Sequence, residues 1–180
     1  EKWGIPLIDI VVCNLYPFEE VAKKKAALGD LIENIDIGGV TLIRAAAKNY
    51  HYVTIVTDPA DYDAVTDELT RLGNVSLETR QKFALKAFAE TALYDSIIHY
   101  TLKKAMEEEE LFPEAYPIPL EKAADLKYGE NPYQSAALYE NPMVDVAFEQ
   151  MGGGKLSYNN LLDADAAVKG MVLLKDSPGC

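Results

Sequence analysis

The stretch ENIDIGGVTLIRAAAKNY, residues 33–50, combines residue types that suit the binding of a flat, polar ligand. Gly38 and Gly39 carry no side chains, so a ligand can approach the backbone there while the N–H groups of a following helix face it. Asp36 stands beside them and offers a carboxylate to a polar ring edge. The alternative is a glycine turn that simply leads into a helix, and position alone does not choose between the two.

Lys48 lies near the end of the same stretch, directly after three alanines. The helix dipole favours a lysine at a helix C-terminus, so spacing alone favours a solvated side chain. A straight helix between Asp36 and Lys48 would separate them by about 18 Å. The two residues can share a pocket only if the helix is shorter than the pattern indicates, or if the chain folds back after Ala47.

Two further segments, CNLYPF and KYGENPYQ, also carry candidate ligand-binding groups. In the first, Cys13, Asn14 and Tyr16 would supply donors and acceptors at the end of a strand; the alternative is a proline turn with a buried Tyr–Phe anchor. In the second, Lys127 and Tyr128 would hold a phosphate or a flat ring, and the alternative is an Asn-Pro turn.

The sequence shows no clear pattern of a metal site, a phosphate-binding loop or a nucleophilic catalytic triad. His51 and His99 stand alone, without a second ligand at a suitable spacing, so no metal site is predicted. The GGGK run at 152–155 lacks the spacing of a phosphate loop and the order of a dinucleotide site, and it is interpreted as a flexible loop. No Ser/Cys–His–Asp arrangement is recognisable.

The elements that must position these residues alternate between strand and helix. Apolar, β-branched runs predict strands buried on both faces at 7–14 and 52–57. Helices are predicted at 18–35 with a break near Gly29, at 40–48, and at 58–73. This alternation predicts a parallel sheet with helices on both faces, whose ligands bind beyond the carboxyl ends of the strands. CNLYPF and TDPADY follow the two strands at that edge.

A long helix and a proline-rich segment divide the rest of the chain. Residues Leu77 to Met106 are helix-forming throughout and would span about 45 Å. Three prolines within 112–119 mark a domain junction. A last helix is predicted at 161–176. The expected domains are therefore 1–75, a linking segment at 76–119, and the start of a further domain at 120–180.

Composition narrows the possible partners. Of the 180 residues 49% are hydrophobic, so the chain can bury a core. A formal net charge of -12 argues against binding to nucleic acid or to an anionic membrane surface. No signal peptide or transmembrane run is recognisable. Cys13 and Cys180 lie far apart in sequence and fit a reducing, cytoplasmic compartment better than a disulfide scaffold.

Six blocks, taken in order, resemble one known family: VVCNLYPF, IDIGGVTLIRAAAKN, VTIVTDPADY, ETRQKFALKAFAETALYD, LKYGENPYQ and LSYNNLLDADAA. The family is the bifunctional purine-biosynthesis enzyme, 5-aminoimidazole-4-carboxamide ribonucleotide formyltransferase / IMP cyclohydrolase, and the resemblance covers nearly the whole chain. It implies an internal piece: the later part of a cyclohydrolase domain resembling methylglyoxal synthase, the linking helix, and the start of a formyltransferase domain resembling cytidine deaminase. It also implies a homodimer.

The resemblance implies roles for particular residues. The residues that it assigns to the cyclohydrolase nucleotide site are Cys13, Asn14, Asp36, Ile37, Gly38 and Gly39. Lys48 matches the proton donor and acceptor of ring closure, with Asp36 and Tyr16 as further catalytic candidates. Lys127 and Tyr128 match the pair that binds the amine substrate of the formyltransferase. Tyr133 stands where many members have His, which puts any role carried over to that position in doubt.

The implied chemistry is formyl transfer from 10-formyltetrahydrofolate to the ribonucleotide amine, followed by dehydrative ring closure to IMP. Its substrates are a nucleotide and a folate, and we expect no metal in the cyclohydrolase step. The family's phosphate loop would precede Glu1 and its Lys-His pair would follow Cys180, so the isolated piece is expected to have neither activity. The alternatives are a methylglyoxal-synthase-like lyase and a non-catalytic nucleotide-binding domain.

Overall fold

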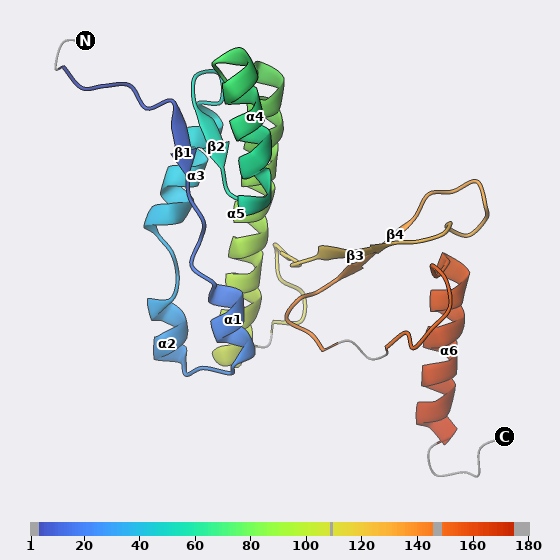
Figure 1. Ribbon diagram of the computed structural model, residues 1–180. Coiled ribbons are helices and arrows are strands. Elements are labelled where there is room, and N and C mark those ends of the chain that lie inside the picture. The colour runs from blue at the N-terminus through green and yellow to red at the C-terminus, as the bar shows by residue number, and fades with distance from the viewer. Residues whose placement is uncertain (1–3, 109, 146–148, 175–180) are drawn as a thin grey trace. The chain divides into compact units, whose positions relative to one another are not determined.

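The computed structural model describes residues 4–108, 110–145 and 149–174. The chain divides into two compact units, the first ending at Pro119 and the second beginning at Leu120. In the first unit, strands and helices alternate before one long helix, whereas the described residues of the second form a strand pair and one helix (Figure 1).

The first unit contains a two-stranded parallel sheet, which confirms the predicted α/β class. Strand β1 (Ile10–Val12) pairs with β2 (Thr54–Val56), with Ile10 opposite Thr54. All three residues of β2 are buried. Because the strands are parallel, their carboxyl ends lie at the same edge of the sheet.

The prediction of an eight-residue strand at 7–14, buried on both faces, was wrong. Only Ile10–Val12 form the ladder, and Leu7 and Val12 are 88% and 55% exposed. Within the residues that the structure describes, β2 is the only strand paired with β1. The apolar residues at 7–14 predicted a buried strand, but within the described residues they are largely exposed.

The predicted helix at 18–35 is two short helices, and the predicted break lies shortly before Gly29, at residues 24–27. Helix α1 (Phe18–Lys23) and helix α2 (Leu28–Glu33) are separated by Lys25, whose φ is 54°. This left-handed conformation costs an L-residue about 1–2 kcal/mol. The burial of Phe18 and Leu31, each of which anchors one of the two helices, offsets that cost.

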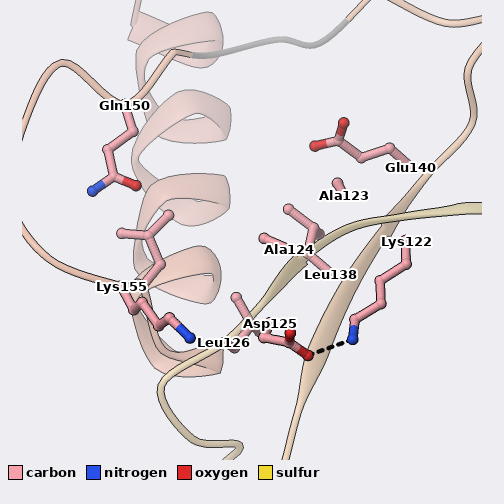
Figure 2. A pocket seen from close by; sticks show the side chains of 10 residues that line it. Lys122, Ala123, Ala124, Asp125, Leu126, Leu138, Glu140, Gln150 and Lys155 are labelled. Carbon is pink, nitrogen blue, oxygen red and sulfur yellow. Dashed lines mark ion pairs between the residues drawn. The ribbon is translucent and has the colours of Figure 1, made fainter. Parts of the chain in front are cut away.

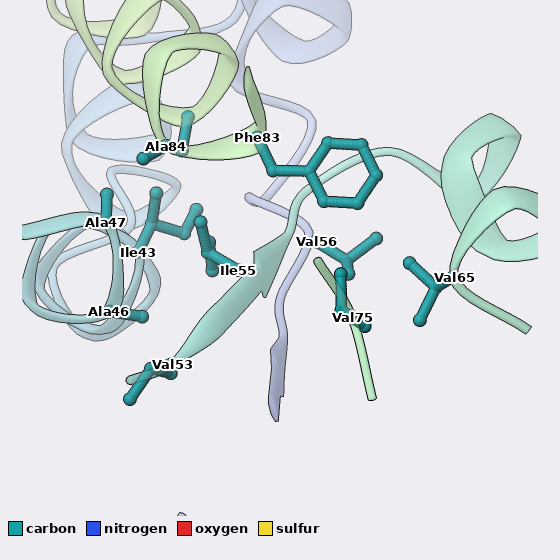
Figure 3. Packing of buried hydrophobic residues seen from close by; sticks show 11 residues of the cluster. Ile43, Ala46, Ala47, Val53, Ile55, Val56, Val65, Val75, Phe83 and Ala84 are labelled. Carbon is teal, nitrogen blue, oxygen red and sulfur yellow. The ribbon is translucent and has the colours of Figure 1, made fainter. Parts of the chain in front are cut away.

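Helix α3 (Gly38–Lys48) packs against the long helix and β2. It begins two residues earlier than the predicted 40–48, so both glycines lie in its first turn. Its apolar face contributes Ile43, Ala46 and Ala47 to the core. Figure 3 shows Ile43 beside Ile55 of β2, while the Phe83 ring lies nearer to Val56 of the same strand.

The predicted helix at 58–73 consists of a 3₁₀ turn (Pro59–Asp61) and helix α4 (Tyr62–Leu72). The Asp58 carboxylate accepts a hydrogen bond from the Ala60 N–H at 2.9 Å and so caps the turn. Gly73 ends α4 with a φ of 73°, a conformation that glycine adopts without a steric penalty. The sequence predicted both ends of this segment.

Helix α5 (Leu77–Ala105) confirms the long unbroken helix. Ser76 caps it, because its hydroxyl accepts a hydrogen bond from the Thr79 N–H at 3.2 Å. The Glu68 carboxylate fixes this cap by accepting from the Ser76 N–H at 2.7 Å. Phe83, Ala84 and Ala87 pack into the same core as α3 and β2, so α5 is part of the first unit.

The second unit contains an antiparallel pair, β3 (Glu121–Asp125) and β4 (Ala137–Glu140), and helix α6 (Tyr158–Leu174). These two strands were not predicted from the sequence. The last helix begins three residues before the predicted start, because the Ser157 hydroxyl accepts from the Asn160 N–H at 3.3 Å and caps it. Its predicted last residues, 175 and 176, lie outside the described residues.

Candidate functional site at the strand ends

The residues that follow β1 contact the end of β2. The Cys13 N–H donates to the Val56 carbonyl oxygen at 3.0 Å. The Asn14 side-chain amide donates to the Thr57 carbonyl oxygen at 2.6 Å. On its other side, Asn14 Oδ1 lies 3.5 Å from the Tyr62 hydroxyl, which donates to it. Cys13 and Asn14 are thus fixed at the carboxyl edge of the sheet.

Asp36 connects this edge to α3. It is only 9% exposed, and one carboxylate oxygen accepts from the Gly39 N–H at 2.7 Å. The other accepts from the Tyr16 N–H at 3.3 Å, while the N–H of Asp36 donates to the Tyr94 hydroxyl at 2.9 Å. The carboxylate therefore caps α3 and holds the CNLYPF segment against it.

The two glycines after Asp36 have different surroundings. A Cβ atom on Gly39 would lie 2.5 Å from Asp36 Oδ2, so this glycine is required by the approach of the carboxylate. A Cβ on Gly38 would meet nothing within 4 Å, and the neighbouring Ile37 is 74% exposed. Gly38 and Ile37 therefore remain accessible to a ligand. The space beside Gly39 is filled by the Asp36 carboxylate.

The Cys13 thiol lies beside this helix start, 3.9 Å from the Gly39 carbonyl oxygen. Burial raises the pKa of the thiol, and the nearby carboxylates of Asp36 and Glu90 raise it further. Cys13 is therefore held as a neutral thiol. Tyr16 presents a side chain that is 61% exposed.

Lys48 does not join this group. It is the last residue of α3 and is exposed, whereas Asp36 caps the first turn of the same helix. The helix is continuous, so a rise of about 1.5 Å per residue separates the two by about 18 Å along its axis. Neither condition for a shared pocket is met within this chain.

Sequence reasoning missed a second set of polar residues at the strand ends. Lys86 of α5 donates from Nζ to Asp58 and to Asp61, each at 2.6 Å. The hydrogen bond from Lys86 holds the pKa of the Asp58 carboxyl below its usual value. Burial opposes the charged form of Lys86, but its bonds to the two aspartates outweigh burial and raise its pKa.

Glu90 lies one helical turn after Lys86 and is half-buried. Burial raises the pKa of its carboxyl, and a hydrogen bond with the Thr57 side chain and the charge of Lys86 oppose that rise only in part. A signal was present in the sequence. Glu90 lies three residues after Ala87 and four before Tyr94, so it falls on the buried stripe of α5.

In the second unit, the LSYNN segment brackets the KYGENPYQ segment. The Lys127 N–H donates to the Leu156 carbonyl at 2.7 Å, and the Tyr158 N–H donates to the Tyr128 carbonyl at 3.1 Å. Lys127 Nζ lies 5.7 Å from the centroid of the Tyr128 ring. The two predicted residues are therefore held as a pair of a cation and an aromatic ring.

A hollow of about 690 Å³ lies near this pair, between the β3–β4 hairpin and residues 150–156 (Figure 2). Lys122 and Asp125 form an ion pair on its wall, and this pairing lowers the pKa of Asp125. Lys155 also lines the hollow. Lys127 and Tyr128 are not among its lining residues, so the hollow and the predicted ligand pair are separate features of the second unit.

The described residues offer neither a metal-binding cluster nor a membrane-spanning helix. No group of three or more His, Cys, Asp or Glu side chains is arranged to hold a metal ion. Among the described helices, none is both long and apolar enough to cross a membrane.

Comparison with known proteins identifies the family. The profile of the AICARFT/IMPCHase bienzyme family matches residues 46–178. The chain belongs to this family. The "Bifunctional purine biosynthesis protein PurH" of Persephonella marina is 51% identical over 93% of this chain, which covers 34% of that protein. The protein of the same name from Thermoanaerobacter sp. is 53% identical over 94% of this chain, which again covers 34% of it.

The chain thus spans about a third of the length of these curated bienzyme relatives. A solved structure described as the crystal structure of ForH is also similar, with 31% sequence identity. That similarity covers 58% of this chain and 55% of that chain, at a TM-score of 0.49.

Proposed function

We propose that this chain is part of the enzyme for the last two steps of IMP biosynthesis. In the first step, 10-formyltetrahydrofolate gives its formyl group to 5-aminoimidazole-4-carboxamide ribonucleotide. In the second, the formylated product closes its ring to IMP with loss of water. The observation that carries this proposal is the match of 93% of the chain to a relative named as a bifunctional purine biosynthesis protein. A methylglyoxal-synthase-like lyase would not account for the family match across the second unit, to residue 178.

The ring-closing site is assigned to the strand ends of the first unit. Asn14 and Cys13 lie at the carboxyl edge of a parallel sheet, where α/β proteins bind their ligands. Ile37 and Gly38 leave the start of α3 open to the base of the nucleotide. The exposed Tyr16 side chain completes this group of contacts.

Ring closure requires two proton movements. The carboxamide nitrogen is a weak nucleophile, so it must lose a proton as it attacks the formyl carbon, and the departing oxygen must gain protons to leave as water. Holding the two groups in contact supplies a further part of the rate. A lysine ammonium that gives and regains a proton is suited to this reaction.

Asp36 and Lys48 take different parts in this proposal. Both carboxylate oxygens of Asp36 already accept backbone N–H groups, so Asp36 positions Tyr16 and the start of α3. Lys48 is exposed at the opposite end of that helix and keeps the role of proton carrier that the family resemblance implies. The two residues therefore do not exchange a proton directly within one chain.

Formyl transfer is assigned to the second unit, where Lys127 and Tyr128 would hold the ribonucleotide amine. The finer fold assignments belong to the same proposal: a methylglyoxal-synthase-like first domain, a linking segment at 76–119, and a cytidine-deaminase-like domain from 120. So does a homodimer in the cytoplasm, where Cys13, which has no disulfide partner among the described residues, stays reduced.

The direct test uses the whole parent protein. It is given the ribonucleotide amine and 10-formyltetrahydrofolate, and IMP formation is followed by ultraviolet absorbance. In a second assay the formylated intermediate is supplied alone, so that ring closure is measured by itself. The proposal expects turnover in both assays, and a parent that is folded but inactive in both would overturn it.

A further inference from the structure

Tyr94 of α5 contacts two segments of the candidate site at once. Its hydroxyl oxygen accepts a hydrogen bond from the Asp36 N–H at 2.9 Å. Its ring packs edge-on against Phe18, the last residue of the CNLYPF segment, with the ring centroids 6.2 Å apart. Both side chains are buried. A single residue of the long helix therefore joins the CNLYPF segment to the residue that caps α3.

The Tyr94 hydroxyl is held in one position. Tyr94 lies on the buried stripe of α5, with Thr91 one turn before it and Ile97 one turn after it. The edge-on contact with Phe18, at an interplanar angle of 70°, restricts rotation of the ring. Because α5 also packs into the core, the hydroxyl is a rigid acceptor that is in place before any ligand arrives.

Asp36 is consequently fixed at three points. Tyr94 binds its backbone N–H, while its two carboxylate oxygens accept from the N–H groups of Tyr16 and Gly39. The side-chain bonds do not replace the bond to Tyr94, because they leave the Asp36 N–H without an acceptor. A buried N–H with no partner is unfavourable, so the backbone would move to find one if the Tyr94 hydroxyl were removed.

Ile37 and Gly38, which remain open to a ligand, follow Asp36 directly. Peptide units are planar and rigid, so a displacement of Asp36 passes to the backbone of these two residues. A ligand would then meet their backbone groups out of place, and part of its binding free energy would go into returning them. The position of Asp36 therefore determines how well this face of the site binds.

We propose that Tyr94 is a positioning residue of the strand-end site, whose hydroxyl acts through the Asp36 N–H to hold the backbone of Ile37 and Gly38 where the base of the ribonucleotide binds. The proposal rests on the proposed function for the identity of the ligand. It predicts an effect on KM for ring closure and not on kcat. Lys48, the proposed proton carrier, lies at the opposite end of α3 and is left in place.

The first experiment measures ring closure by the parent enzyme, with the formylated intermediate supplied alone. Tyr94→Phe keeps the ring and its packing on Phe18 but removes the acceptor of the Asp36 N–H. It should raise KM about tenfold and leave kcat within about threefold of wild type. A protein that is merely destabilised would contain less active enzyme, so its apparent kcat would fall while KM stayed unchanged.

Tyr100→Phe is the matched control for this substitution. Tyr100 lies on the same helix and is half-buried, but its hydroxyl forms no hydrogen bond within the part of the chain that the structure describes. Its loss should leave KM and kcat within about twofold of wild type. A KM raised equally by Tyr100→Phe would overturn the proposal, because the effect would then not depend on the Asp36 N–H.

The second experiment follows amide hydrogen exchange, which distinguishes a local displacement from a general loss of stability. In Tyr94→Phe, exchange at residues 34–38 should accelerate about tenfold or more, while the amides of α4 in the same unit keep their wild-type rates. Equal acceleration of both segments would contradict a positioning role.

Wild type alone still decides if circular dichroism shows that Tyr94→Phe does not fold. The proposal then expects the Asp36 N–H to be protected from exchange and IMP to slow exchange at residues 34–38 further. An Asp36 N–H that exchanges as fast as a free amide would overturn the contact on which the proposal stands.

The outcomes separate this proposal from the proposed function. If the folded wild-type parent does not close the ring of the supplied intermediate, the proposed function is wrong. If wild type closes the ring but Tyr94→Phe keeps the wild-type KM, the positioning role is wrong. A fall in kcat at unchanged KM leads to the same conclusion, because Tyr94 would then only stabilise the fold.

Discussion

Gly38 and Gly39 are indistinguishable in the sequence, but the structure gives them different tasks. Gly39→Ala would place a Cβ 2.5 Å from Asp36 Oδ2 and push the carboxylate away from the helix start. We expect it to lower the free energy of unfolding by about 1–3 kcal/mol, as the loss of a buried cap does. Urea denaturation of the parent protein measures this change.

Gly38→Ala is the matched control for this prediction. A Cβ there meets nothing within 4 Å, and alanine favours the helix over glycine by about 0.5–1 kcal/mol. The free energy of unfolding should therefore stay unchanged or rise. Equal destabilisation by the two substitutions would show that Asp36 does not require the glycine at position 39.

Lys48 carries the residue-scale prediction about catalysis. If its ammonium moves the proton, Lys48→Ala in the parent should lower ring-closure turnover by about 100-fold and leave formyl transfer intact. Lys24→Ala, at the exposed C-cap residue of α1, is the control for loss of a surface charge. Unchanged ring closure would return Lys48 to the solvated lysine that its position at the helix end favours.

At the scale of elements, the sequence predicted those that local signals define. The cap at Asp58, the left-handed Gly73 and the unbroken α5 follow from residue types next to them in the chain. The break after α1 was predicted a few residues late, near Gly29, because the left-handed conformation falls on Lys25, a residue type that gives no such signal. Strand β3 was missed because EKAAD lacks β-branched and aromatic residues.

The candidate site was predictable to a similar extent. Cys13, Asn14 and Asp36 follow strand ends or precede a helix, and the structure brings them together. Lys86 and Glu90 were missed because polar residues on a helix usually face water. Only the contact of α5 with the end of β2 shows that they belong to this site.

Glu90 also gives an element-scale prediction about stability. Its pKa is raised in the folded protein, so the folded state binds a proton more tightly than the unfolded state does. Stability therefore falls as the pH rises from about 4.5 through the folded pKa, and ionised Glu90 remains unfavourable above it. Glu90→Gln should raise the midpoint of thermal unfolding at pH 7 and lose this advantage near pH 4.

Thermal denaturation of wild type and Glu90→Gln across pH 4–7 tests this sign. Glu78→Gln, at an exposed position of the same helix, is the control and should show no such pH-dependent gain. A midpoint lowered by Glu90→Gln at pH 7 would mean that the ionised carboxylate stabilises the fold. In that case its contacts with Thr57 and Lys86 would outweigh the cost of its burial.

At the scale of the whole molecule, the two units divide the two proposed reactions between them. The strand-end group lies in the unit that ends at Pro119, and Lys127 and Tyr128 lie in the unit that begins at Leu120. The formal net charge of -12 repels a nucleotide monophosphate, so each site must overcome that field locally. Substitutions in one unit should therefore impair one reaction and spare the other.

The most direct test of this division measures both reactions in the parent protein and in two variants. Asn14→Ala should lower ring closure about tenfold or more and leave formyl transfer within about twofold. Lys127→Ala should weaken binding of the ribonucleotide amine and lower formyl transfer, while ring closure from the supplied intermediate is retained. This reciprocal pattern is the result that the account predicts. Loss of both activities in each folded variant, or of neither, would contradict it.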